Sequence, residues 1–146
     1  MKKTSILILL LFTTTFLFSQ KKEKLKGSKI VTIEKREIGT FESIEISDNI
    51  EVYLDKGEKS ELKIEADDNL HDIFNIDLSS ATLRIHTSKT ASNYKKLIVR
   101  ITYTNELKMI TSKEETVINA IQEIQLNEIT FKSFDDSKLF LNVVAK

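Results

Sequence analysis

Apolar and polar residues alternate with a period of two along residues 41–54. Ile44 and Ile46 lie on either side of an acidic residue, and the alternation resumes at Ile50, Val52 and Leu54 after the polar stretch 47–49. Successive side chains of a β-strand point to opposite faces of a sheet, so this period is typical of strands with one buried and one solvated face. The polar stretch favours a turn. We therefore predict two strands joined by a turn.

The same alternation recurs in short segments along the rest of the chain. The predicted strand segments are 30–33, 62–66, 76–78, 83–86, 97–103, 107–109, 124–126, 129–131 and 139–143. Polar clusters separate them at 55–58, 67–69, 79–80, 88–93, 104–105 and 135–137. Many short strands with regular turns are typical of an all-β domain. The residues expected in its core are Ile46, Val52, Ile64, Ile85, Val99 and Leu141, and those expected on its outside include Glu45 and Lys63.

The spacing of the apolar segments indicates a weak repeat. Leu62 and Leu83 are 21 residues apart, Leu83 and Leu107 are 24 apart, and Met109 and Phe131 are 22 apart. Such a period is typical of a parallel β-helix or solenoid, in which each coil lays a strand on the previous one. The segments share a pattern and not an identity, so a β-sandwich is the alternative.

Two structures compete for residues 113–125. The capping-box pattern Ser112 to Glu115 precedes an apolar stretch, and Val117, Ile121 and Ile124 would share one face of a helix. The run 116–118 is β-branched throughout, which favours strands. We expect strands and keep the helix as the alternative.

The N-terminus has the layout of a cleaved signal peptide. A basic start at Lys2 and Lys3 precedes the mostly apolar run 6–18, and a polar stretch follows Ser19. That run is shorter than the roughly 20 residues needed to span a bilayer. We expect export to the periplasm, the outer membrane surface or the medium. The predicted organisation is a signal peptide at 1–19, a basic linker or first strand at 20–37, and a β domain at 38–146, with an incomplete C-terminal end of this domain kept as an alternative.

Charge is unevenly distributed after removal of residues 1–19. Residues 20–36 carry seven basic and two acidic side chains, whereas residues 37–146 carry 13 and 20. The basic segment is interpreted as a solvated linker, although lipid headgroups or anionic glycans are alternative contacts. Export and the acidic body argue against nucleic acid as a partner. The chain has no cysteine, which excludes disulfides, thiol catalysis and thiolate metal sites.

Three segments resemble a known family. Residues 41–54, 62–70 and 83–86 are similar to the head GIN domain, which is labelled a putative auto-transporter adhesin, and the resemblance covers about residues 38–146. It implies a parallel β-helix-like domain exported by bacteria of the Bacteroidetes kind, without established catalytic residues. Residues 112–114 and 134–136 depart from the Ser-Gly-type turns of similar proteins. The chain also contains fewer coils than family members tend to have.

The densest cluster of oxygen ligands lies in residues 67–72. Asp67, Asp68, Asn69 and Asp72 could in principle surround Ca²⁺, but their spacing is not that of a twelve-residue calcium loop and no glycine opens the turn. We expect a polar connection in which Asp68 or Asn69 caps a helical turn.

Histidines and carboxylates do not form a catalytic pattern in the sequence. His71 and His86 are expected to be solvated, and no Gly-x-Ser-x-Gly elbow exists. The strand carboxylates expected to face water are Glu45, Glu51, Glu61 and Glu65. A glycosidase would need two carboxylates across a cleft. We therefore predict no catalytic, cofactor-binding or metal-binding residues, and no enzyme activity.

Tyrosines provide a weak indication of glycan binding. Tyr53 lies opposite the core residues of its strand and Tyr94 lies in a polar loop, so both could stack against a sugar if exposed, but we expect ordinary half-buried tyrosines. The predicted function is an exported, non-catalytic domain of the cell envelope that adheres to a surface component, either protein or glycan. A glycan or small-ligand binding module is the alternative, and a divergent carbohydrate-active enzyme is a third. The uncharged apolar stretch 139–144 also predicts an open C-terminal strand edge, which is covered either by self-association or by further coils absent from this chain.

Overall fold

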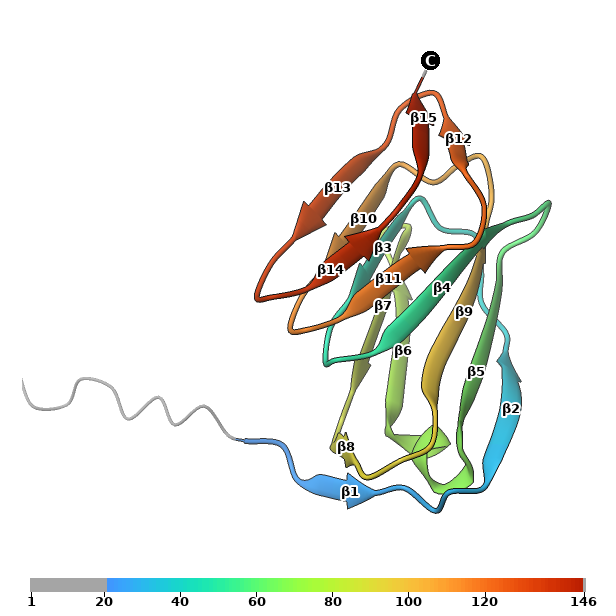
Figure 1. Ribbon diagram of the computed structural model, residues 1–146. Coiled ribbons are helices and arrows are strands. Elements are labelled where there is room, and N and C mark those ends of the chain that lie inside the picture. The colour runs from blue at the N-terminus through green and yellow to red at the C-terminus, as the bar shows by residue number, and fades with distance from the viewer. Residues whose placement is uncertain (1–20, 146) are drawn as a thin grey trace, which may run out of the picture.

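A computed structural model describes residues 21–145 of the chain (Figure 1). The described part is an all-β domain with one short 3₁₀ helix. Its elements are β1 (Lys24–Lys26), β2 (Val31–Arg36), β3 (Ser43–Ile46), β4 (Glu51–Lys56), β5 (Glu61–Asp67), η2 (Asp68–Ile73), β6 (Phe74–Ser79), β7 (Thr82–Thr87), β8 (Thr90–Ser92), β9 (Leu97–Tyr103), β10 (Met109–Ser112), β11 (Val117–Ala120), β12 (Ile124–Leu126), β13 (Thr130–Ser133), β14 (Lys138–Phe140) and β15 (Val143–Ala145).

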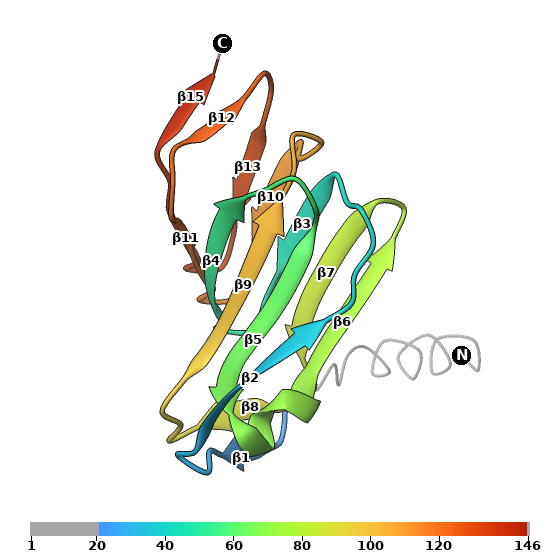
Figure 2. The same ribbon diagram turned by 90° about the vertical axis from the view of Figure 1, so that its right-hand side faces the viewer.

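Two main sheets enclose the core. One has five strands in the order β13-β10-β3-β7-β6, and the other has six in the order β14-β11-β4-β9-β5-β2. Figures 1 and 2 show these sheets side by side, with the smaller pair β12-β15 at the C-terminal end and β1-β8 at the other end. Alternate residues of both large sheets meet in one buried apolar cluster, as the period of two predicts.

Parallel pairing dominates the C-terminal part of both sheets. Strands β13, β10, β3 and β7 are parallel neighbours, and so are β14, β11, β4 and β9. Strands β2, β5 and β6 join antiparallel at the opposite end. The register places Ile110 beside Phe131, 21 residues apart, which is within one residue of the predicted spacing in this region. Leu62 lies on an antiparallel strand, so its spacing to Leu83 does not mark a coil.

Three stacked turns connect the two sheets along one edge. Each contains two consecutive residues with positive φ: Asp48 and Asn49, then Glu114 and Glu115, then Asp135 and Asp136. Backbone N–H groups of two turns donate to the next, from Asn49 to the carbonyl of Glu114 (2.8 Å) and from Glu115 to that of Asp135 (3.0 Å). Positive φ is unfavourable for residues with a Cβ, and less so for Asn and Asp. The stacking bonds therefore hold a conformation that a Ser-Gly turn would adopt more easily.

Residues 113–125 form strands, and the helical alternative is wrong. Strands β11 and β12 pair in parallel with β14 and β15. Ile118 and Ile124 are buried, while Val117 is half-buried and Ile121 is 53% exposed, so the residues of the supposed helical face do not share an environment. Pairing with two neighbouring strands satisfies the backbone of this β-branched segment and outweighs the capping-box signal.

Five of the six predicted core residues are buried. Leu141 is only half-buried, although it packs against the core cluster. It lies between β14 and β15, which occupy the outermost positions of their sheets among the described strands. Lys63 is exposed as predicted, whereas Glu45 is half-buried beside Lys113.

The predicted signal peptide lies outside the described residues. Within residues 21–145, none of the helical structure has the length and apolar character required to cross a bilayer.

Candidate functional site

The outer face of the five-stranded sheet carries a row of polar side chains. Parallel register places Lys132 beside Thr111, Thr111 beside Glu45, and Glu45 beside Arg84 on four consecutive strands. A second row places Met109 beside Ser43, and Ser43 beside Thr82. The small residues leave a shallow hollow of about 640 Å³. Its lining consists of Ser43, Ile44, Glu45, Thr82, Arg84, Met109, Thr111, Lys113, Lys132, Phe134 and Asp135.

Ion pairs hold the charged side chains of this hollow in place. Lys113 Nζ donates to Glu45 Oε1 at 2.9 Å. Arg84 Nη1 donates to Ser79 Oγ at 2.9 Å and lies 4.0 Å from Asp77 Oδ2. The side chains of Glu45, Arg84 and Lys113 all remain about one-third to two-fifths exposed. They are therefore ordered by neighbours and still available to a ligand.

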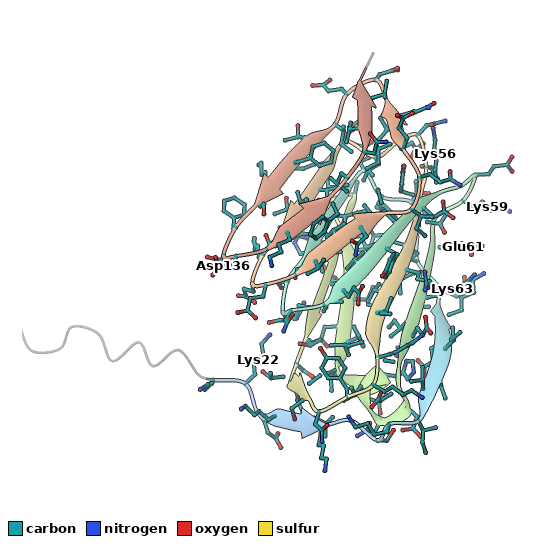
Figure 3. All side chains as sticks on the ribbon, viewed as in Figure 1. Lys22, Lys56, Lys59, Glu61, Lys63 and Asp136 are labelled. Atoms are coloured by element: carbon teal, nitrogen blue, oxygen red, sulfur yellow. The ribbon has the colours of Figure 1, made fainter. Side chains whose placement is uncertain are left out.

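An acidic edge follows the three stacked turns. Asp48, Glu114, Glu115, Asp135 and Asp136 line a second hollow of about 450 Å³. Lys22 pairs with Asp48, and Figure 3 shows Asp136 and Lys22 on the same side of the molecule, away from Lys59 and Lys63.

The carboxyl groups of Asp48 and Glu114 influence each other. Burial disfavours the charged form of Asp48, but hydrogen bonds from Lys22 and from the Thr87 backbone more than offset it, so the pKa of Asp48 is lowered. The hydrogen bond with Asp48, together with partial burial and the charge of Asp48, raises the pKa of Glu114. The Lys22 ammonium thus partly neutralises this end of the edge.

Asp67 is a buried structural carboxylate. It accepts backbone hydrogen bonds from Lys29 (2.8 Å), Lys95 (3.0 and 3.1 Å) and Lys96 (3.0 Å). Burial disfavours its charge, but these N–H groups outweigh that effect and lower its pKa. The predicted cap is wrong in detail, because neither Asp68 nor Asn69 caps η2 by a side-chain bond.

Asn69 instead ties down the N-terminal segment. Its Oδ1 accepts from the Ser28 N–H at 2.9 Å, and its Nδ2 donates to the Lys26 carbonyl at 2.8 Å. Among residues 21–145, no group of three or more histidines and carboxylates has a geometry suited to a metal ion.

The expectation that both histidines are solvated is wrong for His71. Its side chain is 3% exposed, whereas His86 is exposed as predicted. His71 Nε2 lies 2.8 Å from Thr32 Oγ1, and Nδ1 lies 3.6 Å from Glu34 Oε2. Strand β2 forms the sheet edge and covers η2 with its polar side. This tertiary packing buries His71, although its sequence neighbours are acidic. The structure places the two histidines in different environments.

Both tyrosines considered for glycan stacking are half-buried, as expected. Tyr53 is half-buried, its hydroxyl donates to Glu51 Oε1 at 2.6 Å, and the Arg100 guanidinium lies 5.0 Å from its ring centroid. Tyr94 lines the hollow at the acidic edge. Sequence reasoning missed Phe134, which lines the hollow on the five-stranded sheet and is 50% exposed. Phe134 lies in a turn, where the alternation of apolar and polar residues gives no information. The only sequence signal for it is that residues 134–136 depart from the Ser-Gly-type turn.

The other strand carboxylates form ion pairs on the sheet surface. Glu65 accepts from Lys96 and from Arg100 (3.4 Å), and the Lys96 hydrogen bond is the main cause of the lowered pKa of Glu65. Glu61 lies 3.5 Å from Lys35 and 3.8 Å from Lys63 (Figure 3). These pairs neutralise charges on adjacent strands.

Fold and surface together define an all-β protein built on parallel strand stacks, with polar and charged outer faces. A family model described as "Putative auto-transporter adhesin, head GIN domain" matches residues 40–146. The chain belongs to this family, which confirms the resemblance found in its sequence. No curated protein matches the sequence.

Crystal structures of similar fold come from Parabacteroides and Bacteroides species. A putative adhesin from Parabacteroides merdae has a TM-score of 0.64 and 20% identity, over 83% of this chain and 55% of that one. A putative adhesin from Bacteroides fragilis has a TM-score of 0.69 and 19% identity, over 82% and 57%. A putative lipid binding protein from Parabacteroides distasonis has a TM-score of 0.65 and 14% identity, over 76% and 49%. The chain thus spans about half the length of these proteins, and the likeness concerns the fold.

Proposed function

We propose that the chain is an exported, non-catalytic module of the cell envelope that adheres to a surface component. The observation that supports it most is membership of the adhesin-like family over residues 40–146. The parallel register adds to this, because it arranges outward side chains in rows that form broad, regular faces. Function of this kind depends on the surface and not on a catalytic constellation.

Binding of the purified mature chain to intact bacteria tests this proposal. Fluorescently labelled protein should bind saturably, with competition by unlabelled protein and a dissociation constant in about the micromolar range. The same chain unfolded by heat serves as the control. Absence of saturable binding to any cell type, measured by flow cytometry, would contradict adhesion.

Export is a separate part of the proposal. The basic start, the short apolar run 6–18 and Ser19 favour cleavage just before Gln20. Mass spectrometry of envelope and medium fractions should therefore find a chain beginning near Gln20. Recovery of intact Met1 in membranes would refute cleavage.

We infer further that the parallel strands are coils of a β-solenoid whose last edge accepts another strand. Among the described residues, β13, β14 and β15 each pair on one side only. Their other side presents backbone donors and acceptors to any chain that adds there. A second copy of the protein is the proposed occupant.

A glycan-binding module is the second candidate function. The hollow on the five-stranded sheet favours it, because hydroxyl, guanidinium, ammonium and carboxylate groups converge there beside an exposed aromatic ring.

A further inference from the structure

We propose that the hollow on the five-stranded sheet binds a short, neutral oligosaccharide, with Phe134 as the surface on which a sugar ring stacks. This inference rests on the proposed function as a surface-interaction module and specifies a site and a ligand class for it. Four features of the hollow carry it, namely its size, its polarity, its charge balance and the support of its aromatic ring.

The hollow has the size of a small-molecule site. Its volume of about 640 Å³ lies within the roughly 300–1,000 Å³ typical of ligand pockets. Ser43, Thr82 and Thr111 form much of its base, and their short side chains keep it open. Its lining is much smaller than the roughly 20–30 residues a side of a stable protein interface. A short oligomer fits it better than a folded partner does.

The polar groups of the hollow alternate along the direction across the strands. Lys132, Thr111, Glu45 and Arg84 lie on four neighbouring strands in one register row. Strand spacing of about 4.8 Å places a new polar group at intervals close to the length of one pyranose unit. Donors and acceptors in alternation suit the hydroxyl groups of a sugar, each of which both donates and accepts.

The charges of the hollow are nearly balanced. Lys113 is paired with Glu45, and Arg84 lies near Asp77, while Lys132 and Asp135 contribute one charge of each sign. An anionic or cationic ligand would gain little net attraction there. The binding of an uncharged, hydroxyl-rich ligand does not depend on net charge, and such a ligand can use both kinds of charged group as hydrogen-bond partners.

Phe134 is an aromatic residue on a turn whose backbone is held by hydrogen bonds. Its backbone N–H donates to the Ser112 carbonyl at 3.0 Å, and the Ser137 hydroxyl lies 3.1 Å from the same nitrogen. The next two residues have positive φ, which fixes the turn. The ring is nevertheless half exposed and lines the hollow. An aromatic side chain has only two rotatable side-chain bonds, so on a fixed turn it loses little conformational entropy when it stacks against the apolar face of a sugar.

A titration with defined oligosaccharides tests the site. The mature ¹⁵N-labelled chain is titrated with neutral tetrasaccharides of glucose, mannose, galactose and N-acetylglucosamine, and with a tetra-uronate for comparison. We expect at least one neutral tetrasaccharide to shift the amide signals of Ser43, Thr82 and Thr111. The Phe134→Ala variant should bind it about tenfold more weakly. Phe140→Ala is the matched control, because Phe140 is 59% exposed on the six-stranded sheet, and it should leave the affinity unchanged.

A second variant tests the hollow by filling it while leaving Phe134 in place. Ser43→Arg should fill the space and abolish the shifts, while an unchanged amide spectrum elsewhere shows that the fold is retained. Saturable binding to cells that persists in Phe134→Ala and Ser43→Arg, with no response to any neutral tetrasaccharide, would overturn the glycan site and leave the proposed adhesion intact. Stronger shifts with the tetra-uronate than with every neutral sugar would overturn the choice of a neutral ligand.

Discussion

Asp67 links three segments that are distant in sequence. Its carboxylate accepts N–H groups from Lys29, Lys95 and Lys96, and a Cβ added at Gly27 would lie 2.3 Å from Asp67 Oδ2. The charge is thus solvated by backbone dipoles in place of water. The N-terminal segment depends on this residue for its position against the sheet.

Substitution of Asp67 should destabilise the protein strongly. In Asp67→Asn the amide group presents donors toward backbone donors, so buried N–H groups lose partners. We expect a loss of about 2–4 kcal/mol in the free energy of unfolding, measured by urea denaturation at neutral pH. Asp72→Asn, at an exposed position of η2, should change it by less than about 0.5 kcal/mol. Equal effects of the two variants would contradict the role given to Asp67.

The same carboxylate makes the stability depend on acid pH. The pKa of Asp67 is lowered in the folded protein, so its contribution is present above its unfolded pKa of about 3.9 and is lost as pH falls through the folded pKa. The stability difference between wild type and Asp67→Asn should therefore shrink below about pH 4. A difference that is constant between neutral and strongly acid pH would show that the charge is not the cause.

Glu114 predicts the opposite pH dependence. Its pKa is raised in the folded protein, so its charged form weakens the fold as pH rises above the unfolded value of about 4.3. Glu114→Gln should raise the stability at pH 7 by up to about 1 kcal/mol, a small gain because the group is exposed. Thermal unfolding at pH 7 and pH 4 measures it, and the gain should vanish at pH 4. Glu115→Gln in the same turn is the control.

At the scale of the residue, the sequence predicts the exposure of some side chains and not of others. His86 follows the strand alternation and is exposed as expected, whereas the burial of His71 depends on β2, which lies far away in sequence. Phe134 has no alternating neighbours, so its position over the hollow follows only from the pairing of β10 with β13. Local periodicity assigns faces within a strand and carries no information about what covers a turn.

At the scale of the element, one strand provides a matched test of face assignment. In β5, Ile64 is fully buried and Lys63 is exposed. Ile64→Ala should cost about 2–4 kcal/mol, because it removes packed methyl groups and leaves a cavity. Lys63→Ala should stay within about 0.5 kcal/mol. Denaturant unfolding compares them, and similar losses would mean that the two faces are wrongly assigned.

Prediction from alternation worked well for strands in the sheet interior and poorly at the edge. Residues 41–54 form β3 and β4 with the expected faces. Strand β2 behaves differently, because Thr32, Glu34 and Arg36 share the inner side while Ile33 is 67% exposed. An edge strand can place polar groups inward when a loop or helix with polar partners lies beneath it, and its own sequence does not reveal that.

On the scale of the whole molecule, the edge formed by β13, β14 and β15 predicts self-association. Val144 is 42% exposed in β15, whereas its neighbour Val143 is half-buried and packs on the core, so Val144 is the better position for a charge. Sedimentation over a concentration series should find assembly of the mature chain, and Val144→Lys should weaken it. Ile121→Lys, at an exposed apolar residue outside this edge, should not. A monomer at every concentration would contradict the open edge.

The order of the strands in the stack could not be predicted from the sequence. Strands β3 and β4 come early in the chain, yet they lie between β7 and β10 in one sheet and between β9 and β11 in the other. Alternation identifies each strand but gives no measure of which strands become neighbours. The predicted spacings therefore located the late strands approximately and misplaced Leu62.

This order has a consequence for how the chain folds. Ile44 is paired with Leu83, 39 positions later, and with Ile110, 66 positions later, so both sides of β3 wait for segments that leave the ribosome after it. Folding of such a chain is slow, because the conformational entropy of loop closure is lost before the contacts between distant segments stabilise the structure. During that delay the segments of β3 and β4 have no partner strands, and their apolar faces are exposed. They can then pair with wrong segments. The nascent chain therefore has to be kept apart from other chains until residue 120 has been synthesised.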